Sequence, residues 1–499
     1  MAKAQPHAVP PASPTNSNSA GANDEQRVPL LTKLVYGTGD WSMASFNTIR
    51  QIFYAIFLTD VVGLAPGLAS FAALLGIVWD AINDPIIGSL SDRITTRWGR
   101  RRPFLLLFSI PFGAAFVLLW WAPPWEHPAA LMVHVTLAYM LADTLQTLVV
   151  VPFLALMPEM TEDYDERTSL TSYRMVFNLI ASLAAAAGAP EIVAAFDAPQ
   201  RGYMVMALIF GGLGALPFLL IFLLTRERHE QTSVPDLNIQ QSLKMAWRNV
   251  PFRIATGINL LNWVTFDLVA LMLPYFLKYW IDGGEQAHQI AVPLLGNLTT
   301  ESLVFFILLT TAIAAVPLWN YAAHHWNKRT AYIAGMSFWA VVQILVITVM
   351  PGQYTYMFIL AFFAGISVST AHVLPNALFP DVLEWDELLT GRRRDGMYYG
   401  ILNLTRKVTS AVSIFLALQV LALFNYQTPP IGATFFQQSP ETLAAIRALT
   451  GPGGAVFLFG AIIMTFFYPV TREQHARMRR LLARRRARQR HPQQSESQP

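Results

Sequence analysis

Stretches of about 20 apolar residues alternate with short polar links along almost the whole chain. An α-helix rises about 1.5 Å per residue, so a run of about 20 residues crosses a hydrocarbon core about 30 Å thick. The runs at 103–122, 203–224 and 330–350 contain no charged residue. The pattern predicts an all-α membrane protein with twelve spans, at about 30–57, 64–90, 103–122, 129–156, 168–188, 203–224, 252–277, 302–323, 330–350, 354–379, 396–424 and 453–470.

The composition agrees with this prediction. Apolar residues make up 54% of the 499 residues and charged residues only 13%, whereas soluble domains average about 25% charged residues. These values exclude a disordered chain, a nucleic-acid-binding protein and a typical soluble enzyme. The chain has no cysteine, which excludes disulfides, thiol chemistry and thiolate metal sites.

The links divide the chain into segments. Residues 1–28 have no apolar run, so we expect a disordered tail and no signal peptide. The longest link, 226–250, separates one six-helix bundle, 29–225, from a second, 251–470. The basic tail, 471–499, is expected to lie on anionic lipid headgroups. A weak repeat relates the halves, because spans two and eight both contain a proline and end in a basic cluster.

Lys and Arg gather in alternate links. Five arginines follow span two, and the same side carries the basic residues of 226–253, Lys328, Arg329, Arg392–Arg394 and the C-terminal tail. The positive-inside rule therefore places both termini in the cytoplasm. The link 159–166 is acidic, whereas the cluster Arg100–Arg102 is basic. These clusters are either a cytoplasmic gate or only topology signals and solvated loops.

Repeated halves with a site between them are typical of secondary transporters. A channel is usually built around a short pore motif, and we find none. A primary pump needs a nucleotide-binding domain, but the sequence has no GxxxxGK[ST] loop. We therefore expect a transporter that is not an enzyme and has no cofactor.

A charge at the bilayer centre costs about 2.5–3.5 kcal/mol, so each one indicates a partner or a function. The sharpest group is the segment WDAINDP, where Asp80, Asn83 and Asp84 stand at i, i+3 and i+4 on one helical face. Two carboxylates are tolerated together if a cation lies between them or one is protonated. The spacing favours a cation site. The alternative is interhelical salt bridges to a basic residue of another span: Arg50, Arg174 or Lys407.

Other polar residues inside the spans are weaker signals. Asp143, Asp267 and His372 are interpreted as helix-packing groups. Arg174 lies near a predicted helix end, where its side chain could extend to the interface, so position alone leaves its function open.

At these residues the chain resembles the glycoside–pentoside–hexuronide cation symporters of the major facilitator superfamily, the group that contains melibiose permease. The matching motifs occur in family order along nearly the whole chain outside the tails: YGTGDW (36–41), TDVVGL (59–64), WDAINDPIIG (79–88), WGRRRPF (98–104), VPFLALMPEMTEDYDERTSLTSYR (151–174), LPNALFPDVLEWDELLTGRRRDGMYYG (374–400) and LTRKVTSA (404–411). The resemblance implies the twelve-helix facilitator fold in two six-helix bundles, and a bacterial inner membrane as its location.

The resemblance also implies site residues. The family's cation site maps onto Asp80, Asn83, Asp84 and Thr147, its span-eleven lysine onto Lys407, and its sugar-binding arginine onto Arg174. These oxygens form a hard set suited to Na⁺, and protons could replace Na⁺.

Two sugar-binding aspartates of melibiose permease are absent from this chain. Val150 and Ala44 occupy those positions, and Asp40, one turn before Ala44, could partly substitute. A related branch carries lysophosphatidylcholine with sodium, and an apolar Val150 suits an acyl chain better than a hydroxyl.

We therefore expect alternating-access symport of a glycoside, pentoside or hexuronide with Na⁺ or H⁺. Transport of a lysolipid or another amphiphile, and a receptor without transport, remain alternatives. The expected partners are a small solute, a monovalent cation and membrane lipid, with no nucleic acid, and the protein is expected to be a monomer. Sugar binding needs polar groups beside an aromatic face, and the candidates are Asp40, Asn47, Gln51, Arg174 and Lys407, with Tyr36 and Trp41 near them in sequence.

Overall fold

The computed structural model describes residues 28–94, 96–161, 163–227, 246–285, 288–293, 296–390, 395–430, 433, 435–469, 474, 477–482 and 484. The predictions of a disordered N-terminal tail, most of the 226–250 linker, most of the basic C-terminal tail and Arg392–Arg394 fall outside the described residues. They stay predictions.

The first half of the chain forms six long helices. They are α2 (Leu30–Asp60), α3 (Pro66–Arg93), α4 (Arg102–Leu119), α5 (Pro128–Met160), α6 (Tyr164–Ala194) and α7 (Pro199–Leu224). Within this half α2 packs on α6 and α7, while α5 packs on α3 and α4. The crossing of α4 and α7 is close because Gly113 and Gly211 face each other there. A Cβ atom built on Gly113 would lie 2.7 Å from the carbonyl oxygen of Gly211.

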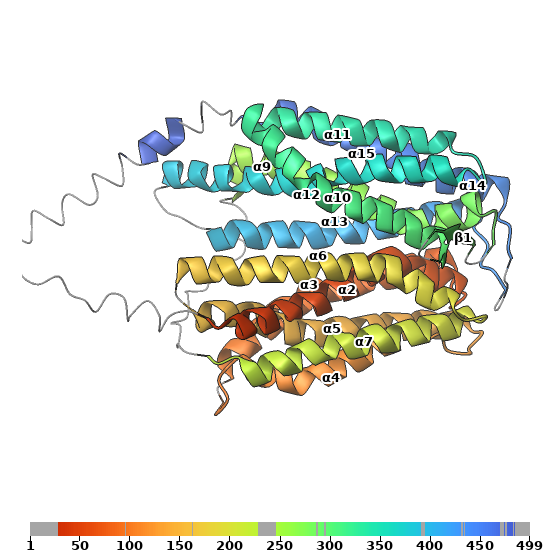
Figure 1. Ribbon diagram of the computed structural model, residues 1–499, viewed down its shortest axis with the longest axis horizontal. Helices are drawn as coiled ribbons and strands as arrows, with labels where there is room; N and C mark the ends of the chain where they lie inside the picture. The colour runs from red at the N-terminus through yellow and green to blue at the C-terminus, as the bar shows by residue number, and fades with distance from the viewer. Residues whose placement is uncertain are drawn as a thin grey trace, which may run out of the picture.

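The second half repeats this number of long helical spans. They are α9 (Val250–Phe276) with a π-turn η1 (Leu277–Ile281), α10 (Thr300–His325), α11 (Lys328–Leu345) with a short 3₁₀ turn η2 (Val346–Thr348), α12 (Tyr354–Thr390), α13 (Asp395–Leu423), and α14 (Pro440–Ala448) continued by a π-turn η3 (Leu449–Gly453) and α15 (Gly454–Phe466). Here α10 and α11 pack on α12, and α9 packs on α13 and α15. The long helices of both halves lie side by side along one direction (Figure 1).

Among the described residues, eleven helical segments are long and apolar enough to cross a membrane, and α2 is not one of them. Its 31 residues would span a bilayer in length. Its mean hydropathy is lowered by polar side chains such as Asp40, Asn47, Arg50 and Gln51. With α2 the fold has the twelve spans that the sequence predicts, and the low hydropathy of α2 reflects residues that turn toward the centre of the molecule.

Two elements differ from the sequence prediction. The last span begins at Pro440 rather than at 453, because Glu441, Arg447 and Pro452 interrupt its apolar pattern without ending the helix. A short antiparallel hairpin also precedes α10, with β1 (Gln289–Val292) paired to β2 (Gly296–Thr299). The hairpin lies outside the spans and leaves the all-α character of the membrane part unchanged.

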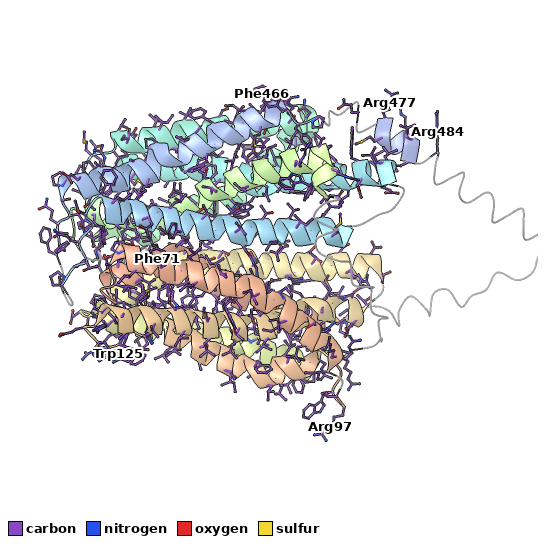
Figure 2. All side chains as sticks on the ribbon, turned by 180° about the vertical axis from the view of Figure 1, so that it is seen from behind. Phe71, Arg97, Trp125, Phe466, Arg477 and Arg484 are labelled. Carbon is purple, nitrogen blue, oxygen red and sulfur yellow. The ribbon has the colours of Figure 1, made fainter. Side chains whose placement is uncertain are left out.

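We call the end where α2 begins and α15 ends the terminal end, and the end that carries the β1–β2 hairpin the hairpin end (Figure 1). Figure 2 shows Arg97, Arg477 and Arg484 at the terminal end and Trp125 near the hairpin end. Large apolar side chains such as Leu107, Ile110 and Leu223 point outward along the spans, each more than half exposed. An apolar exterior of this kind is what a lipid-facing surface requires.

Among the described residues, the main helix contacts between the two halves are α3 with α13, α6 with α10, and α2 with α9. In two of these pairs, α3 with α13 and α2 with α9, both helices carry intramembrane charges singled out in the sequence. The interface between the halves is therefore where charges of α3 meet charges of α13.

Candidate functional site

A cavity of about 480 Å³ lies between the two halves, lined by α2, α3, α5, α9 and α13. Its size suits a small solute. Its apolar lining includes Val150, Leu154, Leu271, Ile414 and Leu418. Its polar lining consists of Asn47, Arg50, Gln51, Asp80, Asp84, Asp143, Gln146, Thr147, Asp267, Asn403, Arg406, Lys407 and Ser410.

A lysine from the second half occupies the predicted cation site of the first half. The Nζ atom of Lys407 lies 2.6 Å from Oδ1 of Asp80 and 2.5 Å from Oδ2 of Asp84. Thr147 donates its hydroxyl to the other oxygen of Asp84, at 3.1 Å. These side chains are only partly exposed, with 18% for Lys407 and 33% for Asp84. The positive ammonium stabilises two carboxylates that would otherwise repel each other.

Asn83 stands apart from this cluster. Its side chain is 4% exposed, and its Nδ2 atom has no hydrogen-bond partner among the described residues. It is not one of the residues that line the cavity. The structure therefore brings together Asp80, Asp84, Thr147 and Lys407, but it places Asn83 beside them rather than in the cavity wall.

A second charged group joins the halves across the cavity. Arg406 donates to both oxygens of Asp267, at 2.6 and 2.8 Å. Gln51 of α2 donates to the same carboxylate at 2.6 Å. The guanidinium of Arg406 also lies 4.0 Å from the ring centroid of Trp263, which is a cation–π distance. The carboxylate of Asp267 therefore accepts hydrogen bonds from Arg406 of its own half and from Gln51 of the other half. This role is more specific than the helix packing that the sequence predicted.

A third group surrounds Arg50. Its Nη1 atom lies 3.7 Å from Asp143, its Nη2 atom donates to Asn47 at 3.2 Å, and its guanidinium carbon is 5.1 Å from the ring centroid of Tyr139. Gln146 donates to the same Asn47 oxygen, at 3.2 Å. Neither Arg50 nor Asp143 was predicted as a site residue from the sequence, but both line the cavity.

Asp40 and Arg174 pair with each other. Arg174 donates to the two oxygens of Asp40 at 2.5 and 3.3 Å, and its guanidinium lies 5.1 Å from the ring centroid of Phe153. Tyr36 donates its hydroxyl to the carbonyl of Phe153 at 3.0 Å. Asp40, Arg174 and the half-buried Trp41 lie nearer the terminal end than the cavity and are not among its lining residues. Asn47, Gln51 and Lys407 are the predicted solute residues that the structure places in the cavity wall.

A dense hydrogen-bond cluster joins the halves at the hairpin end. Asp60, the last residue of α2, accepts from Lys278 at 2.5 Å, Tyr279 at 2.6 Å and Tyr426 at 2.5 Å. Thr59 shares a hydrogen bond with Tyr275 at 2.9 Å. The carboxylate of Asp60 is 3% exposed. We call Asp60 with Lys278, Tyr279 and Tyr426 the hairpin-end latch, because one acidic group of the first half is enclosed by donors of the second.

The charged pairs described at the terminal end lie within each half. Lys33 pairs with Glu166 at 2.8 Å, and Arg101 with Glu159 at 3.3 Å. In the second half Lys328 pairs with Asp381 at 2.9 Å. The Arg101–Glu159 pair joins the acidic link 159–166 to the Arg100–Arg102 cluster, and the role of these clusters as a cytoplasmic gate stays a prediction.

Exposure along the cavity wall indicates which end is open. Ala55, Leu58 and Leu418, toward the hairpin end, are 5%, 1% and 0% exposed. Leu154, toward the terminal end, is 39% exposed, and Asn47 and Asn403 are exposed as well. The cavity is therefore closed toward the hairpin end, where the latch lies, and open toward the terminal end.

This arrangement matches known transporters. A family profile described as MFS/sugar transport protein matches residues 35–472. The chain belongs to this family. It is 30% identical to an uncharacterized symporter of Synechocystis sp., over 92% of this chain and 97% of the relative. A putative glycoside/cation symporter of Escherichia coli is 27% identical over 92% and 96%, and the sodium-dependent lysophosphatidylcholine symporter 1-A of Danio rerio is 24% identical over 89% and 86%.

Solved structures agree on the fold. A bacterial homologue of the human lysosomal transporter Spinster, in an inward-facing and unoccupied conformation, superposes with a TM-score of 0.60 at 13% identity, over 88% of this chain and 96% of that one. The chain is therefore a multi-pass membrane transporter with the twelve-helix major facilitator fold.

The lining residues that sequence reasoning missed, such as Arg406 and Gln146, share a helical spacing with the predicted Lys407 and Thr147. Asn403, Arg406, Lys407 and Ser410 stand at i, i+3, i+4 and i+7, so they form one polar stripe on an otherwise apolar helix. Asp143, Gln146 and Thr147 repeat that spacing on α5. A polar stripe inside a membrane helix indicates the side that faces a cavity or another helix.

Proposed function

We propose that the transporter carries a sugar together with Na⁺, and that Asp80, Asp84 and Thr147 hold the cation. The observation that carries this proposal is the position of Lys407, whose ammonium lies within 2.6 Å of both carboxylates. A pair of carboxylates that already binds the ammonium of Lys407 in a polar cavity is suited to bind a different cation in its place. The carboxylate and hydroxyl oxygens are hard ligands of the kind that Na⁺ prefers.

Competition between Lys407 and Na⁺ supplies a coupling mechanism. Lys407 belongs to α13 of the second half, whereas Asp80 and Asp84 belong to α3 of the first. Na⁺ between the two carboxylates would displace the ammonium and weaken this contact between halves. We propose that the solute stabilises the same conformation as the cation, so that each raises the affinity for the other by the same factor.

Alternating access is supported by the asymmetry of the two ends. The hairpin-end latch closes one side, while the cavity wall is exposed toward the other. The positive-inside rule assigns the terminal end, where Arg97, Arg477 and Arg484 lie, to the cytoplasm. We infer a bacterial inner membrane with both termini inside, and a conformation that is open to the cytoplasm.

A sugar is favoured by the density of hydrogen-bonding groups in the wall. Asn47, Gln146, Asn403 and Ser410 present amides and a hydroxyl to a cavity of about 480 Å³. Groups of this kind fix the orientation of a polar ligand. The relative named as a glycoside/cation symporter points the same way.

A lysolipid is the second candidate. The favouring observation is the apolar strip formed by Val150, Val151 and Leu154 of α5, all of which line the cavity. A strip of this kind accommodates an acyl chain without leaving hydroxyl groups unpaired. The Danio rerio relative named as a lysophosphatidylcholine symporter is consistent with this alternative.

Uptake into proteoliposomes separates these candidates. Radiolabelled methyl glycosides, pentosides, hexuronides and lysophosphatidylcholine would be offered with a Na⁺ gradient and with choline replacing Na⁺. We expect Na⁺-stimulated uptake of at least one sugar. Uptake of lysophosphatidylcholine with no sugar uptake would replace the proposal by its alternative, and the absence of all Na⁺-stimulated uptake would refute both.

A further inference from the structure

Arg50 differs from the other two cationic side chains of the cavity wall in how its charge is matched. Lys407 has two carboxylate oxygens within 2.6 Å, and Arg406 has two within 2.8 Å. The nearest carboxylate oxygen to Arg50 belongs to Asp143 and is 3.7 Å away. That distance is an ion pair without a hydrogen bond. Arg50 is therefore the cation of this wall whose acidic partner is held loosely.

The guanidinium of Arg50 has donors to spare. It carries five N–H groups, and the described residues accept one hydrogen bond from it, at Oδ1 of Asn47. Gln146 also donates to that oxygen. Tyr139 covers one face of the guanidinium, and the side chain is 24% exposed at the cavity. Asn47 therefore holds one edge of the planar guanidinium and Tyr139 holds one face. The remaining N–H groups can donate to a ligand.

The partner carboxylate shows the same incomplete pairing. Asp143 is 5% exposed, and its Oδ2 atom has no hydrogen-bond partner among the described residues. A buried pair that exists only for packing gains most from close, bidentate geometry, because both charges have lost their water. The looser geometry at Arg50 is what a site needs if a ligand is to bind the arginine in place of the aspartate.

We propose that Arg50 binds the carboxylate of an anionic sugar, so that the preferred solute is a sugar acid of the uronate type. This inference rests on the proposed sugar symport and deepens it. A carboxylate accepts two parallel N–H bonds from a guanidinium fork, a geometry that a neutral hydroxyl cannot reproduce. Asp143 competes with the ligand for Arg50 and balances its charge when the cavity is empty.

The competing explanation is that Arg50 is only the counter-ion of Asp143. The two explanations differ in a double variant. If the pair is structural, Arg50→Gln with Asp143→Asn restores a balanced site and leaves sugar selectivity unchanged. If Arg50 binds the acid, the same double variant is folded but has lost its preference for the acid.

The test is isothermal titration of the purified full-length protein in Na⁺ buffer with glucuronate against glucose and galacturonate against galactose. In the wild type we expect at least one acid to bind more tightly than its neutral partner, by about 10-fold or more. Arg50→Gln should reduce this ratio by about 10- to 100-fold, the loss expected for a charge-assisted hydrogen bond. Arg50→Lys, which keeps the charge but not the fork, should give an intermediate ratio.

Two further variants sharpen the test. Asp143→Asn removes the competing carboxylate, so acid binding should become tighter relative to neutral sugar. Arg97→Gln removes the same charge from an exposed loop and should leave the ratio unchanged. An Arg50→Gln/Asp143→Asn protein that is folded and still prefers the acid would overturn the inference.

The outcomes separate this inference from the function on which it rests. Na⁺-dependent binding of neutral sugars with no preference for the acids would refute the role of Arg50 and leave sugar symport standing. Binding of lysophosphatidylcholine with no binding of any sugar would refute both.

Discussion

Lys407 acts as an internal cation at a site of two acidic residues. Asp80 and Asp84 lie one helical turn apart, so without a positive charge between them both would be destabilised in a low-dielectric cavity. The ammonium relieves that repulsion in the conformation described. The same geometry makes the lysine a competitor of any external cation, which is the residue-scale basis of the proposed coupling.

Removing Lys407 should therefore make the protein more dependent on Na⁺. We expect Lys407→Ala to unfold at a lower temperature in choline than the wild type, and to gain more thermal stability on addition of Na⁺. The measurement is thermal unfolding in detergent with matched ionic strength. Lys328→Ala is the control, because Lys328 pairs with Asp381 away from the cavity. An equal Na⁺ response in wild type and Lys407→Ala would contradict competition at this site.

Three residues of the proposed cation site and its lysine partner stand in or near matching motifs: Asp80 and Asp84 in WDAINDPIIG and Lys407 in LTRKVTSA, with Thr147 four residues before the motif that begins at 151. Asp80, Asp84, Thr147 and Lys407 lie together, and the two aspartates form the interhelical salt bridges to Lys407 that were the alternative to a cation site. Cation binding at these residues stays a prediction. Asn83 does not join them, because successive helical residues turn by about 100°. Asp80 and Asp84 are then about 40° apart, whereas Asn83 lies about 60° to the other side of Asp80. A shared face is thus too coarse a criterion for choosing ligands.

The pairing of Arg174 with Asp40 was not predictable from sequence. Both residues were expected to meet a solute, but each satisfies the other nearer the terminal end. A single sequence places charges along helices and does not say which of several opposite charges on other helices will be in reach. That choice depends on the rotation and tilt of each helix.

At the scale of elements, close helix crossings depend on small residues. Gly211 of α7 faces Gly113 of α4, and a Cβ on Gly211 would lie 2.8 Å from the carbonyl oxygen of Gly113. Gly212 is exposed and has open space around it. We expect Gly211→Leu to lower the unfolding temperature clearly, because the helices must separate, and Gly212→Leu to change it little. Equal effects of the two substitutions would show that this crossing does not determine stability.

The junction between η1 and α10 gives a pH-dependent element. Asp282 follows η1 and accepts a hydrogen bond from Thr300 at 3.1 Å. Burial raises the pKa of the Asp282 carboxyl from 3.8 to about 7. The pKa of the Asp282 carboxyl is higher in the folded than in the unfolded protein. The protonated carboxyl therefore contributes fully to the free energy of unfolding below about pH 4, and this contribution is lost as the pH rises through about 7.

Thermal unfolding between about pH 5 and pH 8 measures this effect. The wild type should lose stability as the pH rises across that range, and Asp282→Asn should flatten the profile because an amide does not titrate. An unchanged slope in the variant would assign the pH dependence to other groups.

Most element boundaries could be predicted from the apolar runs, because a bilayer requires a minimum helix length. The last span was the exception. Glu441, Arg447 and Pro452 hide its first half, where α14 continues through a π-turn into α15. The β1–β2 hairpin was missed as well, since its four-residue strands are too short to give a clear alternation.

At the scale of the whole molecule, the hairpin-end latch lies on the closed side of the cavity, and we expect it to hold that side closed. Asp60 collects three donors from the second half. Asp60→Asn removes the negative charge that attracts Lys278, so the hairpin end should open more often. The substitution should shift the population toward the state open at that end.

Labelling of a single cysteine tests this shift. The chain has no cysteine of its own, so Ala55→Cys, in the closed part of the cavity wall, reports on access alone. A membrane-impermeant maleimide added on the hairpin side should react several-fold faster when Asp60→Asn is also present. Glu441→Gln, at the same end and away from the latch, should not change the rate. Equal rates with and without Asp60→Asn would show that the latch does not hold that side closed.

The overall fold could be predicted from twelve spans, two halves and the motifs that resemble a known family. Which end is closed could not, because that depends on a balance between contacts at two ends of the molecule. The residues of the latch illustrate the reason. Asp60, Lys278 and Tyr426 are far apart in sequence, and their meeting depends on how the halves tilt against each other.

The central claim is that Asp80 and Asp84 couple the solute to the cation. The most direct measurement is solute affinity as a function of Na⁺ concentration, in purified wild type, Asp80→Asn, Asp84→Asn and the double variant. Asp197→Asn, in an exposed loop, is the control. We predict that Na⁺ raises the solute affinity of the wild type and of Asp197→Asn, and that each cavity variant still binds solute with little or no Na⁺ response. Full Na⁺ stimulation in a folded Asp80→Asn/Asp84→Asn protein would contradict the claim.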